Sequence, residues 1–230
     1  RYLVLGYLEI DWDAGVVGVL RLEASTGGLL ADIGFIVNAS FNLEINSTST
    51  SRDAIILIAP GETITITIPK ETFRIGIAGD FIFKPGGTEL FRLSGVFYLE
   101  ITSESLTIFA DVKLYLGPPE ARIFTFDALG LLVFRYNGEM GIKLDLSGSV
   151  SLGDVLEFNC AFEFLMNTSG KEITFNVPEQ YRAQVGYDSI IIPDTPPGLD
   201  GSTSGQAESF YVVIKGAGTL SLLGGILVLN

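Results

Sequence analysis

Apolar and polar residues alternate along most of this chain, and this pattern constrains the fold more than any other feature. In the segment 41–49 (FNLEINSTS) the apolar residues stand at every second position, and 63–69 (TITITIP) and 141–146 (GIKLDL) repeat the pattern. Successive side chains of a strand point to opposite faces, so each of these segments is expected to be a half-buried strand. Clusters of glycine, proline, asparagine and aspartate interrupt the pattern roughly every 8 to 12 residues. The sequence therefore predicts an all-β fold with little or no helix.

Short strands joined by tight turns favour hairpins between sequence neighbours. The expected architecture is an antiparallel meander of sheets that forms β-sandwich-like tandem repeats. A β-solenoid is the alternative. Its rungs would need a repeat of roughly 20 to 30 residues, and the repeat that this chain shows is much longer.

Similar strings recur in the same order in the two halves of the chain, which indicates a tandem repeat. Segment 5–23 (LGYLEIDWDAGVVGVLRLE) resembles 129–146, and 41–49 resembles 162–170. The offset between the matched segments is 121 to 124 residues early in the repeat and 137 later. The matched pairs are Gly6 with Gly130, Gly18 with Gly141, Phe41 with Phe162, and Glu71 with Glu208.

The repeat divides the chain into a first β unit at 1–124 and a second, incomplete unit at 125–230. The increase in offset locates an insertion of about 16 residues, and 193–207 (PDTPPGLDGSTSGQA) has the composition of an exposed loop. Both ends of the sequence fall within strand-like segments. We therefore expect a piece of a longer array, whose apolar strands other repeats or other chains help to cover.

Composition removes several classes of function. The chain has no histidine, which excludes Ser-His-Asp and Cys-His nucleophiles and histidine zinc sites. Its net charge of −13 makes nucleic acid and anionic lipid poor partners. No run of about 18 apolar residues is present, so no transmembrane helix is expected. The single cysteine, Cys160, lies between Phe158 and Phe162 and is predicted to be a small buried apolar residue.

Two segments carry a resemblance to a known group of proteins. The strings at 41–48 (FNLEINST) and 162–169 (FEFLMNTS), together with GDFIFK at 79–84, resemble the tandem β units of very large, adhesin-like bacterial proteins. The second string departs from the phrase at Leu165 and Met166. The resemblance implies a structural or adhesive role in a secreted or cell-surface protein.

Carboxylates are the chemical groups left for a site. Asp11 and Asp13 suit a calcium ion in an oxygen-rich loop, and Asp194 with Asp200 offers the same ligands in the second half. Pairs such as Asp11 with Asp13, or Glu157 with Glu163, would be needed for glycosidase chemistry. The matching turn of the second half replaces the acids with Arg135 and Asn137, so we expect no enzyme activity, and no cofactor beyond possible calcium.

Two further patterns bear on partners. Exposed aromatic residues can stack on sugars, and the candidates are Trp12, Phe91, Phe97, Tyr98 and Tyr136. Three Asn-x-Ser/Thr sequons, at Asn38, Asn46 and Asn167, are candidate glycosylation sites of a secreted protein. Asn46 and Asn167 occupy nearly the same position in the two halves.

The sequence favours a structural function. We expect an acidic, extracellular β-repeat segment of a fibre, filament or adhesin stalk that assembles with neighbouring copies or further repeats through apolar strand faces and edges. The alternative is an extracellular module that binds carbohydrate, or binds lipid in an apolar groove made by a curved sheet. Such a groove requires apolar residues that remain uncovered in both repeats.

Overall fold

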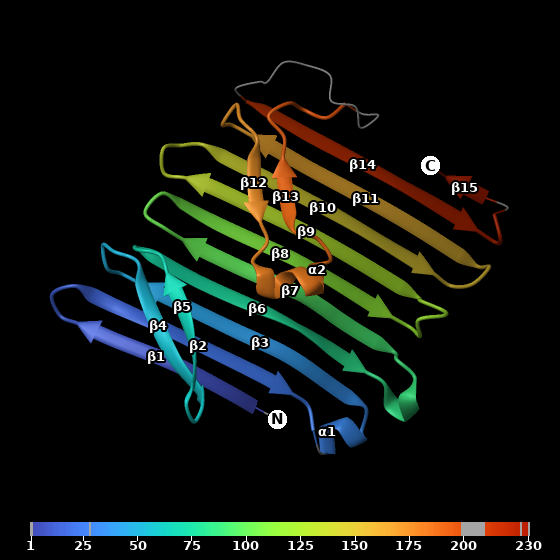
Figure 1. Cartoon of the computed structure of the whole chain (residues 1–230). Coiled ribbons are helices and arrows are strands. Elements are labelled where there is room, and N and C mark those ends of the chain that lie inside the picture. Colours follow the sequence, from blue (N-terminus) through green and yellow to red (C-terminus); the bar gives the residue numbers. More distant parts are fainter. Residues whose placement is uncertain (1, 28, 199–209, 226, 230) are drawn as a thin grey trace.

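Eleven antiparallel strands form one open sheet in the computed structural model of the chain, which describes residues 2–27, 29–198, 210–225 and 227–229. The order is β1-β2-β3-β6-β7-β8-β9-β10-β11-β14-β15, so strands that follow one another along the chain are neighbours (Figure 1). The predicted all-β antiparallel meander is confirmed, and the β-solenoid alternative is wrong. The strands are β1 (Tyr2–Asp11), β2 (Gly15–Ser25), β3 (Phe35–Asn46), β6 (Thr72–Phe83), β7 (Phe91–Ile101), β8 (Ser105–Leu116), β9 (Phe124–Arg135), β10 (Met140–Ser151), β11 (Leu156–Asn167), β14 (Tyr211–Leu222) and β15 (Leu227–Leu229).

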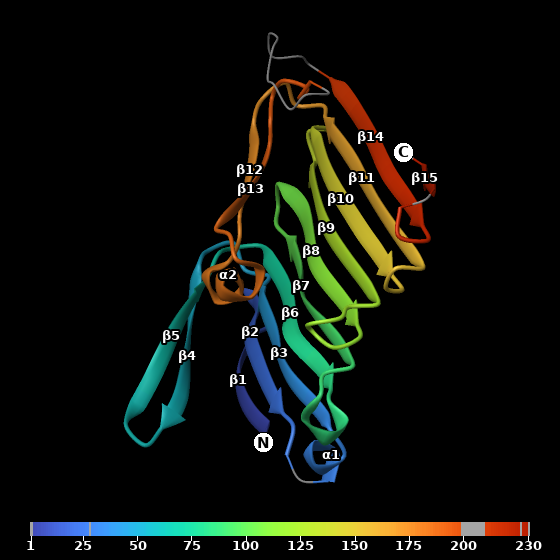
Figure 2. The ribbon, with the colours of Figure 1, turned by 90° about the vertical axis from the view of Figure 1, so that its right-hand side faces the viewer.

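Two insertions fold back over one face of this sheet. The first is the hairpin β4 (Arg52–Ala59) and β5 (Glu62–Ile68), which lies between β3 and β6 in the sequence. The second consists of β12 (Ile173–Asn176), α2 (Glu179–Val185) and β13 (Ser189–Ile192), between β11 and β14. Figure 2 shows both insertions on the same side of the large sheet, which gives a sandwich with one incomplete layer. Two short helices, α1 (Leu29–Asp32) and η1 (Pro85–Gly87), lie in turns at one end of the strands.

Each insertion buries its own small core against the sheet. Under β4 and β5, the buried residues are Val17, Val19, Ala54, Ile56 and Ile68. Under β12, α2 and β13 lies a larger cluster that includes Phe109, Leu131, Ile173, Val177 and Ile192.

Close approach of α2 depends on one glycine. A Cβ atom at Gly76 would lie 1.6 Å from the Tyr181 hydroxyl oxygen, so any side chain there would push the helix off the sheet.

The strand order is the same in the two halves. The first insertion lies in the sequence between the last two strands of the group β1-β2-β3-β6. The second insertion lies between the last two strands of the group β9-β10-β11-β14. β8 and β9 pair from Ser105–Arg135 to Leu116–Phe124, so the halves on either side of residue 124 belong to one continuous sheet.

The register corrects one of the residue matches. Val17 lies opposite Asn46, and Gly141 lies opposite Asn167, so Gly141 corresponds to Val17 and the match with Gly18 is off by one residue. The predicted loop at 193–207 falls largely outside the described residues. Its described part, 193–198, is partly buried, and it includes the buried Thr195.

Candidate functional site

The two faces of the large sheet differ completely in chemistry. Residues directly opposite each other on paired strands share a face, and the register can be followed strand by strand from β1 to β14. We call the face that the insertions occupy the covered face. The other, the open face, consists of the even-numbered positions of β1, β2, β8, β9, β10, β11 and β14 and the odd-numbered positions of β3, β6 and β7.

No charged or amide side chain lies on the open face. From Val4 in β1 to Leu222 in β14, every position of this face is glycine, alanine, an aliphatic residue, phenylalanine, methionine or Cys160. The two halves contribute equally. One row across the strands reads Leu20, Leu43, Ile75, Leu99, Ile108, Leu132, Ile142, Met166 and Val212.

The open face is large and uncovered by the described part of the chain. Strands of 10 to 12 residues extend about 40 Å, and ten neighbouring strands span about 43 Å, which gives an area on the order of 1,700 Å². Ile77 and Phe97, a directly opposed pair near its centre, remain 46% and 39% exposed. Monomeric proteins rarely expose contiguous apolar patches above roughly 300–600 Å². A face of this size therefore indicates an interaction surface.

A hollow of about 300 Å³ lies near the middle of the open face. Its floor is formed by Ala39, Gly79 and Gly95, and its walls include Phe81 and Phe97. The two glycines are required by the close approach of neighbouring backbones. A Cβ at Gly79 would lie 2.4 Å from the carbonyl oxygen of Asn38, and one at Gly95 would lie 2.5 Å from that of Asp111.

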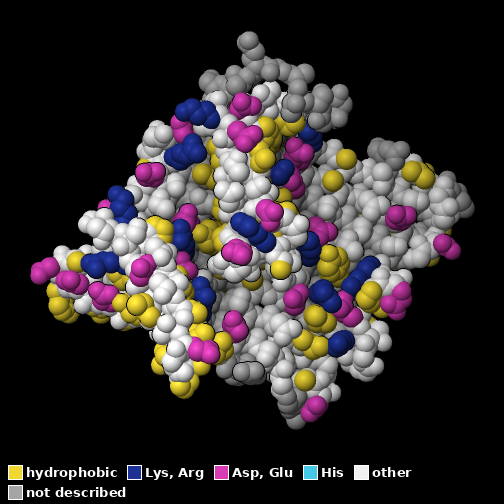
Figure 3. Space-filling model, viewed as in Figure 1, with side chains coloured by type: hydrophobic (Ala, Val, Ile, Leu, Met, Phe, Trp, Pro, Cys, Tyr) yellow, Lys and Arg dark blue, Asp and Glu magenta, His cyan; other side chains and the backbone are white. Residues whose placement is uncertain are grey.

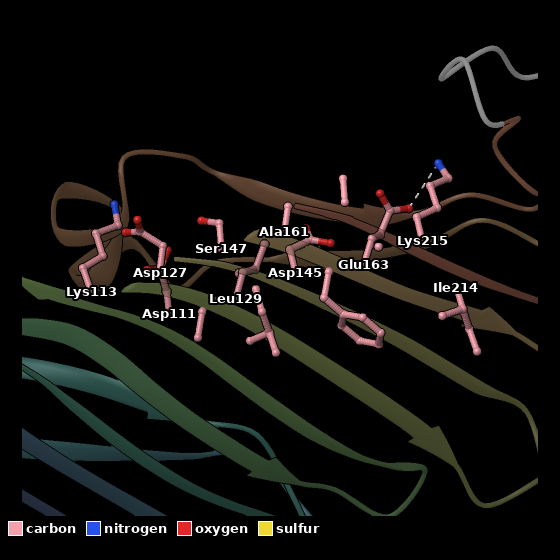
Figure 4. A pocket seen from close by; sticks show the side chains of 15 residues that line it. Asp111, Lys113, Asp127, Leu129, Asp145, Ser147, Ala161, Glu163, Ile214 and Lys215 are labelled. Atoms are coloured by element: carbon pink, nitrogen blue, oxygen red, sulfur yellow. Dashed lines mark ion pairs between the residues drawn. The ribbon is translucent and has the colours of Figure 1, made fainter. Parts of the chain in front are cut away.

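The covered face carries the charges, which Figure 3 shows interspersed over and between the insertions. Beyond the second insertion lies a trough of about 720 Å³, shown from close by in Figure 4. Side chains from five neighbouring strands line it, among them Asp111, Lys113, Asp127, Asp145, Glu163 and Lys215.

Most of these charges have a partner within the layer. Lys215 pairs with Glu163 at 3.5 Å, and Lys143 with Asp145 at 2.9 Å. Within the part of the chain that the structure describes, no group of three or more acidic or cysteine side chains is arranged to hold a metal ion. The trough is therefore an acidic surface, with four carboxylates against two lysines, and its geometry suits no metal ion among the described residues.

A second polar hollow, of about 570 Å³, lies between the two insertions. Arg74 there forms ion pairs with Glu100 and, at 3.4 Å, with Glu44, and the Tyr98 hydroxyl donates to Glu100 at 3.0 Å. Burial raises the pKa of Tyr98, and the neighbouring Glu100 carboxylate raises it further. This network links the neighbouring strands β3, β6 and β7 on the covered face and pairs its charges with one another.

The described acidic residues that were predicted to bind calcium accept hydrogen bonds within turns and loops. The Asp11 carboxylate accepts hydrogen bonds from the backbone N–H groups of Asp13 at 2.9 Å and Ala14 at 3.1 Å, which lower the pKa of Asp11. This contact caps the β1–β2 turn. Asp194 accepts a bond from the Thr195 hydroxyl at 3.0 Å, and Asp200 lies outside the described residues. Calcium binding at Asp11 and Asp13 stays a prediction.

Glu157 and Glu163 do not form a catalytic pair. They lie six residues apart on the same strand, β11, which separates them by roughly 20 Å. Glycosidase carboxylates lie within about 5 to 9.5 Å of each other.

The aromatic residues do not come together as a platform. Trp12 is 95% exposed in the β1–β2 turn, and Tyr136 is exposed in the matching β9–β10 turn, where its ring contacts Phe134 at 6.1 Å between centroids. Phe97 lies on the open face and its neighbour Tyr98 is buried on the covered face. Phe91 begins β7 at the other end of the strands, far from both turns.

The three sequons have different environments. Asn38 is exposed within β3. Asn46 and Asn167 are fully buried, and the side-chain nitrogen of each donates two hydrogen bonds to backbone carbonyl groups. The nitrogen that would carry a glycan is therefore occupied at both positions in the folded chain. Glycosylation at Asn38 stays a prediction.

The expectation that Cys160 is buried was wrong. Its thiol is exposed because Cys160 lies on the open face, opposite Gly148 and Gly218, and nothing in the described chain covers it. The same cause explains why sequence reasoning missed the open face as a site. The alternation identifies an apolar side of each strand, but long-range contacts decide which side the insertions cover.

No protein-family model, curated protein or solved structure matches this chain. Among the described residues, no helix is long and apolar enough to cross a membrane. The geometry of the two faces is therefore the basis for assigning a function.

Proposed function

We propose that this chain is an extracellular β-repeat module that binds long apolar chains, such as the acyl chains of lipids, on its open face. One observation carries the proposal: from Val4 to Leu222 the open face is apolar at every position in both halves of the sheet, and it is uncovered by the described residues. A lipid-binding sheet requires such an uncovered apolar surface in both repeats. The extracellular location is supported by the resemblance to secreted repeat proteins and by the exposed sequon at Asn38.

The chemistry of the face selects an apolar ligand. It offers no charge and no side-chain amide, so it cannot orient a sugar or a peptide backbone by hydrogen bonds. Each methylene group that leaves water on such a face gains about 0.8 kcal/mol.

The shape of the face favours a flexible ligand. The hollow above Gly79 and Gly95 interrupts the face, and a hydrocarbon chain can bend to fill it.

A structural role in a longer fibre, filament or adhesin stalk is the second candidate. The observation that favours it is the backbone edge of the sheet. Among the described strands, β1 pairs only with β2, and β15 pairs with β14 only at Leu220–Leu222. Unpaired edges of this kind can continue a sheet into another copy or repeat.

Titration with a fluorescent fatty acid tests the proposal. We expect saturable binding by the 230-residue chain, and a loss of at least about tenfold in affinity for Phe97→Glu, which places a charge at the centre of the open face. Thr65→Glu is the matched control, since it adds the same charge at an exposed position of β5 and should bind normally.

Equal binding by Phe97→Glu and the unchanged chain would contradict the assignment. Light scattering and electron microscopy at rising concentration test the second candidate. Filaments with a regular axial repeat, formed without any lipid binding, would favour the structural role.

A further inference from the structure

The two ends of the strands differ in their exposed side chains. At one end lie the turns after β2, β6, β8, β10 and β14, which Figure 1 shows at the lower right. Exposed aliphatic residues gather there. They are Ile33, Leu90, Ile123, Leu152, Val155 and Leu223.

The opposite end has polar turns. The segments 47–51 (STSTS), 102–104 (TSE) and 168–170 (TSG) contain no apolar residue. The exposed aromatic residues Trp12, Tyr136 and Phe210 lie at that end, in the β1–β2 turn, in the β9–β10 turn and directly before β14. The aliphatic side chains are therefore concentrated at one end of the sheet.

Four of them come from three adjacent turns, and we call this group the aliphatic tip: Ile123, Leu152, Val155 and Leu223. Their exposed fractions range from 48% to 61%. Backbone hydrogen bonds hold the turns side by side. Leu223 N–H donates to the Val155 carbonyl at 3.0 Å, and Ser151 N–H donates to the Ile123 carbonyl at 2.9 Å.

The aliphatic tip is continuous with the open face. Ile123 directly precedes Phe124, and the last row of the open face that spans β9 to β14 at this end is Phe124, Val150, Phe158 and Leu220. A hydrocarbon chain at the tip can therefore reach the open face without passing a polar side chain.

The charges around the tip limit its partner. Glu120, Asp154 and Glu157 lie in or beside these turns, and the one cation there, Arg122, forms an ion pair with Glu89 at 2.6 Å. An excess of carboxylates repels anionic lipid headgroups, whereas a zwitterionic surface carries no net charge to oppose them.

We infer that the aliphatic tip docks the module end-on to a zwitterionic phospholipid bilayer, with Ile123, Leu152, Val155 and Leu223 in the acyl region and the open face leading away from it. The inference rests on the proposed lipid-binding function and adds the source of the lipid. Exposed aliphatic side chains bind a bilayer in proportion to the apolar area that they bury in it.

The position of the sole tryptophan provides a direct test. Trp12 lies at the opposite end of the strands, and Trp12→Phe combined with Leu152→Trp moves this fluorophore to the tip. On addition of phosphatidylcholine vesicles, we expect the emission of the relocated tryptophan to shift to shorter wavelength. The emission of Trp12 in the unchanged chain should stay constant. Phosphatidylserine mixed into the vesicles should weaken the response.

Charged variants test the same contact by vesicle flotation. Leu152→Asp with Leu223→Asp should reduce association at least about tenfold, because two aliphatic contacts are replaced by carboxylates. Tyr136→Asp, at the opposite end, is the matched control and should float as the unchanged chain does. All these positions are exposed turns, and circular dichroism checks that each variant is folded.

Several outcomes would overturn the inference. Shifts at both tryptophan positions would show that the open face lies flat on the bilayer. Fatty-acid binding without vesicle binding would contradict docking at the aliphatic tip and leave the proposed lipid-binding function intact. If the chain bound neither fatty acid nor vesicles, both the docking inference and the proposed function would be wrong. A dimer that Leu152→Asp dissociates, without vesicle binding, would assign the tip to a second copy of the chain.

Discussion

Asn46 and Asn167 hold the same position in the two halves of the sheet and make the same set of hydrogen bonds. Each is the last residue of its strand, and each is fully buried. The side-chain oxygen accepts from the backbone N–H and the hydroxyl of the residue two positions later, Thr48 or Ser169, at distances of 2.7 to 3.0 Å. The side-chain nitrogen donates to Thr50 and Ile68 in the first half, and to Lys171 and Pro193 in the second, at 2.8 to 3.0 Å. In each half, the asparagine thus joins the segment that enters the insertion to the segment that leads back to the large sheet.

Removing either asparagine should destabilise the protein substantially. Asn46→Ala or Asn167→Ala leaves buried carbonyl groups without a donor, and we expect a loss of about 2–4 kcal/mol in the free energy of unfolding. Asn46→Asp keeps the acceptor and loses both donors, so it should be no milder. Denaturant unfolding measures the change.

Asn38→Ala is the control, because Asn38 is exposed, and it should alter stability by less than about 0.5 kcal/mol. A loss below about 1 kcal/mol for both buried asparagines would show that the hydrogen bonds do not hold the insertions.

The asparagines also show where sequence reasoning stops. The pattern Asn-x-Thr/Ser is the same for a glycan acceptor and for a buried turn residue, and burial depends on a carbonyl 22 residues away at Ile68. Only their recurrence at an offset of 121 residues distinguished Asn46 and Asn167 from Asn38. Repetition in this chain therefore marked a structural requirement.

The fold itself was largely predictable, since alternation is a local property and each long strand shows it. Which side of each strand the insertions cover was not predictable from the sequence. Val17 and Val19 are buried because Ala54 and Ile56 pack on them, whereas Leu20 and Leu22, on the same strand, face the open side. Both pairs of residues are apolar, so the sequence of β2 alone does not show which pair is buried.

The contact between Tyr187 and Asp111 should stabilise the second insertion. The tyrosine hydroxyl, in the turn between α2 and β13, donates to the buried Asp111 carboxylate at 2.7 Å. Tyr187→Phe leaves this carboxylate without its donor, and we expect a loss of about 1–3 kcal/mol. A double-mutant cycle with Asp111→Asn measures the pair. A coupling energy near zero would assign any loss to packing alone.

Alkaline pH should weaken the attachment of the second insertion. Burial and the nearby Asp194 raise the pKa of Tyr211 from 10.0 to about 12, and burial also raises the pKa of Tyr187. A raised pKa means that the folded state holds the phenol proton more tightly than the unfolded state. The associated stability is complete below pH 10 and falls as pH rises from 10 towards about 12.

Denaturant unfolding at several alkaline pH values checks this dependence, and tyrosinate absorbance follows the titration. Tyr211→Phe should show a shallower decline above pH 10, although it loses the hydrogen bond from the Tyr211 hydroxyl to the Pro193 carbonyl, 2.6 Å long. An equally steep decline in this variant would exclude Tyr211 as a source of the effect.

Cys160 offers a chemical probe of the open face. Its thiol is exposed between two glycines on the neighbouring strands, so a maleimide reagent should modify it in the native protein. A fatty acid bound along the open face would cover this row, and at a free concentration ten times its Kd we expect labelling to slow roughly tenfold. The control is Trp12→Cys combined with Cys160→Ala, which places the thiol in an exposed turn away from the open face; its labelling rate should not respond to fatty acid. If fatty acid binds and Cys160 is still modified at its original rate, the ligand does not lie on the open face near β11, and the second half of the sheet would have to be removed from the proposed site.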